Sequence, residues 1–107
     1  GEGLGMRSQP QGEPVVKTCF EIVVYKVKGH AAASSAREAA RAVIASYPGF
    51  RTWQALTSTD DADSFADLVT WDDVSYAKAA GEAFQKDARL QPFVAEIGQI
   101  MSMGHYS

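Results

Sequence analysis

Residues 65–84 read FADLVTWDDVSYAKAAGEAF, and this stretch decides the fold that we predict for the chain. Phe65 to Trp71 is rich in aromatic and β-branched residues, which is typical of a strand. Asp72 or Asp73 then stands where a side chain caps the first turn of a helix. That helix has an apolar and a charged side, with Val74, Ala77, Gly81 and Phe84 on one and Lys78, Glu82 and Lys86 on the other.

Further elements are predicted on both sides of this stretch. Upstream we expect a strand at residues 15–27, a helix that is capped by Ser34 or Ser35 and stops at Pro48-Gly49, a strand at 50–58 and a polar turn at 59–64. Downstream we expect a short helix around Pro92 and a strand from Ile100 to Tyr106. In the upstream helix, the charged residues Arg37, Glu38 and Arg41 are predicted to point outward.

The predicted order is therefore strand, helix, strand, strand, helix, strand. Right-handed crossovers and a central hairpin turn this order into an α+β, ferredoxin-like βαββαβ architecture, with an antiparallel four-stranded sheet and both helices on one face. A chain of 107 residues, 46% of them hydrophobic, suits one domain, which we place at residues 15–107. Residues 1–14 hold four glycines and two prolines and are predicted to form a flexible tail.

The two faces of the strand at residues 15–27 differ in composition. Phe20, Ile22 and Val24 form a uniformly apolar set, which we expect to face the helices. The open face would then carry an apolar group made of Val23, Tyr25, Val27, Val69 and Trp71. Such a face needs a cover, and a second copy of the sheet provides one, so we predict a homodimer.

Charge and composition exclude several classes of partner. Ten Lys and Arg against 13 Asp and Glu give a net charge of -3, which leaves no basic field for nucleic acid or anionic lipid. An RNA-recognition module has the same strand order, but the strand at residues 65–71 contains no basic residue. The apolar run from Phe20 to Tyr25 is too short to span a membrane. We expect a soluble, cytoplasmic protein.

The metal-binding residue types are few and scattered. Cys19 stands alone, and His30 and His105 lie in no spacing that two ligands of one metal would need. We therefore expect no metal and no cofactor, and Cys19 is predicted to be a small buried hydrophobe.

Glu21 and Tyr25 share one face of the first predicted strand. If Glu21 is buried, desolvation raises the pKa of its carboxyl and makes it a candidate base toward a phenolic substrate. An exposed position at an edge is the equally weighted alternative.

The helix ending in YPGF (Tyr47 to Phe50), the strand with Trp53 and the segment LVTWDDVSYAKAAGEAF (Leu68 to Phe84) together carry a family resemblance. Over residues 15–106 the chain resembles the dimeric α+β barrel superfamily, in its antibiotic-biosynthesis-monooxygenase-like branch. The resemblance implies a ferredoxin-like subunit and a dimer whose sheets form a barrel. In some members it implies oxidation of polycyclic phenols or quinols by molecular oxygen without a cofactor.

The resemblance also implies roles for individual residues. Trp71 resembles a tryptophan that lines the pocket of monooxygenase members, Tyr76 stands near a phenol that binds a substrate oxygen, and Asp67 stands where an amide is expected. Each has a structural alternative: packing for Trp71, a solvated rim for Asp67 and a half-exposed flank for Tyr76. With Glu21, these three are the candidate catalytic residues, and the candidate substrate contacts are Tyr25, Val23, Trp53, Val69 and Phe84.

Two functions follow from these expectations. The first is a cofactor-independent monooxygenase acting on a small aromatic phenol or quinol. The alternative is a non-catalytic, ligand-binding or stress-related dimeric barrel protein. Haem-degrading relatives use an asparagine on the first strand and a histidine on the second helix, and neither is present here, so we do not expect haem degradation.

Overall fold

The computed structural model describes residues 17–107, so the predicted tail at residues 1–14 and the first two residues of the predicted strand at 15–27 lie outside the described part. The elements are β1 (Cys19–Val27), α1 (His30–Ile44), β2 (Phe50–Thr57), β3 (Ser64–Trp71), α2 (Val74–Lys86), a 3-10 turn η1 (Ala88–Leu90), α3 (Gln91–Glu96) and β4 (Ile97–Tyr106).

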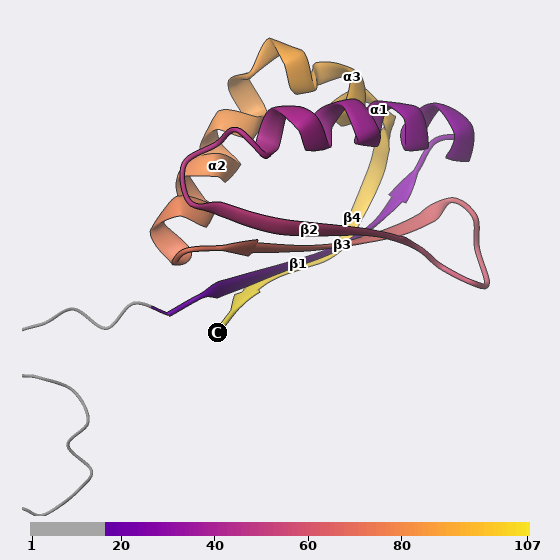
Figure 1. Cartoon of the computed structure of the whole chain (residues 1–107). Helices are drawn as coiled ribbons and strands as arrows, with labels where there is room; N and C mark the ends of the chain where they lie inside the picture. Colours follow the sequence, from indigo (N-terminus) through magenta and orange to yellow (C-terminus); the bar gives the residue numbers. More distant parts are fainter. Residues whose placement is uncertain (1–16) are drawn as a thin grey trace, which may run out of the picture.

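The strands form one antiparallel sheet in the order β2-β3-β1-β4, and the helices lie together on one side of it (Figure 1). This arrangement confirms the predicted ferredoxin-like α+β fold. The long helices α1 and α2 are the two crossovers, and η1 with α3 continue the helical layer before β4 returns along β1.

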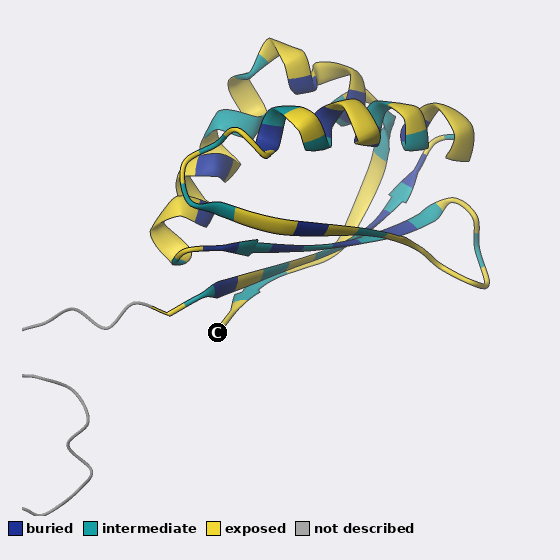
Figure 2. Cartoon of the chain, in the orientation of Figure 1, coloured by how far each residue is buried: buried dark blue, intermediate teal, exposed yellow. Residues whose placement is uncertain are grey.

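The prediction of which sheet face meets the helices was wrong. Cys19, Tyr25 and Val27 are buried beneath the helical layer, whereas Phe20 and Ile22 are 40% and 38% exposed on the helix-free face. Figure 2 shows that buried segments recur along the strands and the helices. The helical side of the sheet also carries Val23, Val69 and Trp71. Val23 lies two residues before Tyr25 on the same face of β1, and Val69 and Trp71 are the cross-strand partners of Glu21 and Cys19. Both faces of β1 are largely apolar and each carries one charged residue, Glu21 on the buried face, where Trp71 bonds it, and Lys26 on the other face.

Helix α1 differs from its prediction at its start, at its end and in its buried side. It begins at His30, and Gly29 rather than Ser34 or Ser35 occupies the capping position. It ends at Ile44, before the predicted stop at Pro48-Gly49, and turns connect it to β2. Arg37 was expected to point outward but is only 4% exposed. The buried side of α1 follows a helical spacing that includes it, through Ala33, Arg37, Ala40 and Ile44.

The second half of the chain agrees more closely with the elements predicted from the sequence. Asp73 caps α2 by accepting hydrogen bonds from the backbone amides of Ser75 and Tyr76. Pro92 lies in the first turn of α3, where its missing amide hydrogen costs nothing. Strand β4 begins at Ile97, three residues before the predicted Ile100, and is bulged against β1.

The core lies between the sheet and the helices, where aromatic rings meet edge to face. Tyr25 contacts Phe65 on β3 and Phe93 on α3, with ring centroids 5.8 and 6.0 Å apart. Phe93 in turn meets Phe84 of α2 at 6.1 Å. The aromatic cluster therefore joins the central strands to the later helices.

Within residues 17–107, the helices are too short or too polar to cross a membrane. The cytoplasmic location expected from the composition stays a prediction.

Gly49 is the one described glycine with a left-handed backbone, at φ 78°, and a Cβ built there would lie 2.2 Å from the Tyr76 ring. We expect Gly49→Ala to lower the free energy of unfolding by about 1–2 kcal/mol from backbone strain, with a further loss from the ring contact. Gly81 in α2 has open space, so Gly81→Ala is the matched control and should raise stability by about 0.5–1 kcal/mol. Urea denaturation measures both, and equal effects of the two substitutions would refute the packing role of Gly49.

Candidate functional site

The strand register brings most of the candidate residues onto the helix-facing side of the sheet. Trp53, Val69, Glu21 and His105 form one row across β2, β3, β1 and β4. The adjacent row contains Asp67 and Val23, and the row on the other side contains Trp71 and Cys19. Functional groups from the four strands therefore share one surface beneath the helices.

Glu21 is held by Trp71. The indole Nε1 of Trp71 donates a hydrogen bond of 2.9 Å to Oε1 of Glu21. Trp71 is 2% exposed and meets Phe50 edge to face at 5.7 Å, so its ring is fixed from the opposite side. Within residues 17–107 no donor bonds the second carboxylate oxygen of Glu21. One oxygen is thus anchored while the other stays available.

The surroundings of Glu21 favour proton uptake. Burial raises the pKa of its carboxyl above the ordinary glutamate value, and the charge of Asp67 adds to the rise. The hydrogen bond from Trp71 and the charge of His105 act in the opposite direction but do not cancel the effect of burial on the pKa. A raised pKa is what a carboxylate needs to accept a proton from a weakly acidic substrate.

Asp67 occupies a different environment, inside a buried ion pair. Its Oδ1 accepts from the Arg37 guanidinium at 2.9 Å, and its Oδ2 accepts from the Tyr25 hydroxyl at 2.6 Å. Arg37 also donates to the backbone carbonyl of Leu56 and lies 3.8 Å from the ring centroid of Phe65. The pair joins α1 to β3 and β1.

Both oxygens of Asp67 are therefore committed. Burial raises the pKa of this carboxyl, while Tyr25, Trp53 and the Arg37 guanidinium oppose the rise. Because an arginine keeps its charge, we assign Asp67 as its ionised counter-ion. Burial and the neighbouring Asp67 raise the pKa of Tyr25 well above its usual range, so this phenol remains a hydrogen-bond donor.

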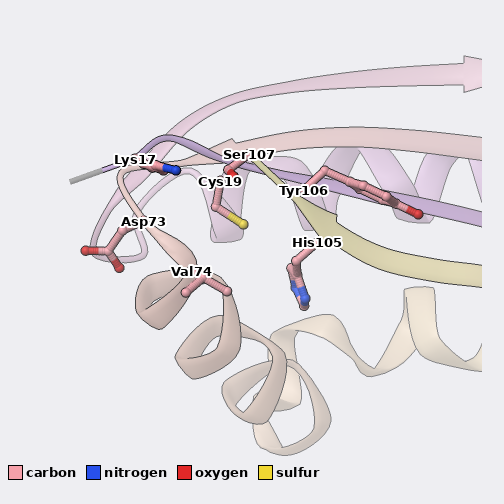
Figure 3. Close-up of a pocket in the computed structure, with 7 residues that line it drawn as sticks. All are labelled: Lys17, Cys19, Asp73, Val74, His105, Tyr106 and Ser107. Carbon is pink, nitrogen blue, oxygen red and sulfur yellow. The ribbon is translucent and has the colours of Figure 1, made fainter. Parts of the chain in front are cut away.

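A pocket of about 350 Å³ opens at the end of the sheet, between β1, β4 and the start of α2 (Figure 3). The imidazole of His105 and the thiol of Cys19 project from the strands toward Val74 of α2. Glu21 adjoins this pocket, because it is the direct cross-strand partner of His105 on the same sheet face. The pocket is lined by Lys17, Cys19, Asp73, Val74, His105, Tyr106 and Ser107.

None of the site residues predicted from the sequence is among the residues that line this pocket, and several lie well away from it. The ring of Tyr76 lies over Gly49, and the residue is 38% exposed. Phe84 packs on Phe93. Trp53 is buried, and its Nε1 has no partner of hydrogen-bond geometry within residues 17–107, although it lies near enough to lower the pKa of Asp67. The structure thus brings Glu21 and Trp71 together beside the pocket and joins Tyr25 to Asp67 deeper in the core.

Two residues of this surface were missed as site candidates from the sequence. Arg37 had been placed outside, although its spacing from Ala33 and Ala40 predicts the buried side of α1. His105 was considered only as a metal ligand. It lies on the same face of the last strand as Met103, and this pattern of residues does not indicate a pocket. Within residues 17–107, no three His, Cys, Asp or Glu side chains form a group that fits a metal ion.

Comparisons with known proteins address the fold. No family model matches the chain, and no curated protein matches it. Among solved structures, SnoaB, a cofactor-independent oxygenase from Streptomyces nogalater, superposes with a TM-score of 0.72 at 19% identity, over 84% of this chain and 91% of that chain. A putative antibiotic biosynthesis monooxygenase from Bordetella bronchiseptica gives 0.68 at 15% identity, over 84% and 95% of the two chains.

A third solved structure was determined with a ligand. The monooxygenase from the gene ActVA-Orf6 of Streptomyces coelicolor, in complex with Nanaomycin D, gives a TM-score of 0.56 at 18% identity over 82% of each chain. The expected resemblance to antibiotic-biosynthesis-monooxygenase-like proteins is therefore confirmed as a shared fold.

The buried ion pair yields a stability prediction. Arg37→Met leaves the Asp67 carboxylate without its counter-ion, and we expect it to lower the free energy of unfolding by about 3 kcal/mol at pH 7. Without Arg37 the folded-state pKa of Asp67 lies further above its unfolded value, so the loss is largest at neutral pH and shrinks as pH falls toward 4. Chemical denaturation at pH 7 and pH 4.5 measures this difference.

Arg51→Met is the matched control, because Arg51 is exposed and, among residues 17–107, bonds only Thr18 and Asp72. We expect a change below about 0.5 kcal/mol at either pH. A pH-independent loss in Arg37→Met would show that packing of the side chain, rather than its charge, stabilises the core.

Proposed function

We propose that the protein is a cofactor-independent monooxygenase that acts on a small aromatic phenol or quinol, with Glu21 as the base. The observation that carries the proposal is the position of Glu21. One of its oxygens is fixed by Trp71, its pKa is raised by burial, and its cross-strand partner His105 lines a pocket. This arrangement presents a basic oxygen at a defined place.

The choice of Glu21 over Asp67 rests on hydrogen bonding. Protonating Asp67 would break its contact with either Tyr25 or Arg37 and leave a buried guanidinium without its counter-ion. Protonating Glu21 leaves the bond from Trp71 to Oε1 intact, since the proton goes to Oε2. Asp67 and Arg37 are then positioning residues that fix the helix layer over the sheet.

The reaction balances with molecular oxygen as the only co-substrate. Glu21 removes a proton from a phenol whose keto tautomer carries a CH₂ group, and the carbon of the resulting anion forms a bond to O₂. Glu21 returns the proton to the peroxide, whose O–O bond breaks as the second C–H proton leaves. The CH₂ group becomes a carbonyl, and the other oxygen atom leaves as water. All electrons come from the substrate, so no flavin or metal is needed.

Two solved neighbours support this class of reaction. SnoaB is named a cofactor-independent oxygenase, and the ActVA-Orf6 protein binds Nanaomycin D. Fold alone does not determine function, so the proposal depends on the Glu21 and Trp71 geometry. If that surface only binds a ligand, the non-catalytic alternative applies. This alternative is favoured by Asp67, because neighbouring side chains bond both of its oxygens and leave it no catalytic use.

We also propose that the protein is a homodimer through its helix-free sheet face. The residues that motivated the dimer from the sequence lie under the helices, but a different apolar set occupies the open face. Phe20, Ile22 and Leu56 are 40%, 38% and 49% exposed there, and Leu68 lies between them on β3. An apolar face of this kind favours a self-complementary contact with a second sheet.

The catalytic prediction concerns oxygen uptake. With a panel of quinols and anthrones, we expect Glu21→Gln to reduce the rate by about 10²- to 10⁴-fold, because a positioned base contributes on that scale. In the wild type, kcat/KM should rise with pH as Glu21 loses its proton. The midpoint should lie above the ordinary glutamate pKa, because burial raises it.

The matched control is Glu38→Gln, which removes an exposed carboxylate that bonds only Arg41 in the described part of the chain. It should keep the wild-type rate and pH profile. Asp67→Asn should change stability more than it changes the pH profile, since Asp67 is not the base. If no substrate of the panel is consumed above background, or if Glu21→Gln matches the wild type, the oxygenase proposal fails.

The dimer prediction concerns mass in solution. Light scattering at micromolar concentration should give about twice the chain mass of 11.5 kDa. Ile22→Lys places a charge in the middle of the helix-free face and should give a monomer. Ala42→Lys adds the same charge on the exposed side of α1 and should remain dimeric. A monomeric wild type would refute the proposed interface.

A further inference from the structure

His105 presents an unexplained polar atom. Its Nε2 is buried, and nothing within residues 17–107 bonds it. Buried ring nitrogens usually have a partner, because an unpaired one loses its hydrogen bonds to water without replacement. The residue lies on β4, an element that packs well against β1, so its backbone is fixed. A ligand that forms a hydrogen bond with Nε2 would account for the missing partner.

The imidazole is also directed at a space that a ligand can enter. His105 lines the pocket of about 350 Å³, opposite Val74 of α2 and beside the Cys19 thiol (Figure 3). Burial raises the pKa of Cys19, so its thiol stays neutral and acts as a weakly polar wall. Oδ1 of Asp73 at the rim accepts the hydrogen bonds that cap α2. Among the lining residues, His105 thus supplies the ring nitrogen that can form a hydrogen bond with a ligand oxygen.

We infer that His105 is a substrate-binding residue whose Nε2 forms a hydrogen bond to the phenolic oxygen of a one- or two-ring aromatic substrate. The inference rests on the proposed function, and it adds the residue that orients the ring and the size class of the substrate. The pocket is at the low end of volumes usual for small-molecule sites, which favours small phenols over larger polycycles.

The position of His105 relative to Glu21 supports this orientation. The two residues are direct cross-strand partners, so a phenolic oxygen bound at Nε2 lies near the carboxylate that accepts its proton. With its proton on Nε2, the neutral imidazole donates to the phenolic oxygen, so the phenol's own proton is free to pass to Glu21 and the phenolate that remains is still hydrogen-bonded.

The chain contains two histidines, which makes a direct binding experiment possible. The probe is 2-naphthol, added to the full-length protein labelled with ¹⁵N at histidine. We expect the imidazole signals of His105 to shift and those of His30 to stay in place, because His30 lies at the start of α1 and bonds the carbonyl of Ala62. His30→Gln assigns the two sets of signals. Equal shifts in both histidines, or none, would overturn the inference.

Affinity supplies a second measurement. His105→Leu should weaken 2-naphthol binding by about 3- to 10-fold, the range expected for loss of one hydrogen bond, and His105→Gln should recover part of the loss. His30→Gln should bind as the wild type does. Unchanged affinity in His105→Leu, with its circular dichroism and Tm also unchanged, would overturn the inference.

Oxygen uptake separates this inference from the proposed function. If Glu21→Gln abolishes uptake while the His105 signals do not respond to 2-naphthol, the oxygenase proposal stands and the role of His105 is refuted. If 2-naphthol shifts the His105 signals and binds more weakly to His105→Leu, but no panel substrate is oxidised, the ligand site stands and the oxygenase proposal fails.

Discussion

The buried pair of Arg37 and Asp67 is the interaction on which the arrangement of the two layers depends. A guanidinium that is 4% exposed and a carboxylate that is 5% exposed stabilise the protein only together, because either alone would be a buried charge. Tyr25 completes the network from β1. The pair therefore fixes where α1 lies over the central strands, and it removes Asp67 from chemistry.

That constraint gives the sheet surface two different regions. Beneath α1, the polar groups satisfy one another and are surrounded by aromatic rings. Toward the start of α2, Glu21 has one bonded oxygen, His105 has an unpaired nitrogen, and a pocket lies beside them. Stability and reactivity are thus separated along the same strands, as expected when a rigid, satisfied network supports a site with spare hydrogen-bonding capacity.

The sequence predicted the order of the elements because their local signals are strong: the Asp73 cap, the turn at Pro48-Gly49 and the β-rich strands. It predicted the wrong inward face of β1 because both faces are apolar, and periodicity alone cannot rank them. Burial of Arg37 was missed because a charged residue is ordinarily exposed, and its partner Asp67 is 30 residues away. Pairings of this kind come from tertiary structure.

The helix-free face explains why composition misled the assignment of β1. A strand that is buried on one face by helices and on the other by a partner sheet has little reason to alternate polar and apolar residues. Phe20, Ile22 and Leu56 would then be core residues of a dimer rather than of a subunit. On this view, the uniformly apolar set of Phe20, Ile22 and Val24, which suggested an inward face, is a consequence of the proposed dimer. The opposite face of β1 carries Glu21 because the proposed site uses its carboxylate.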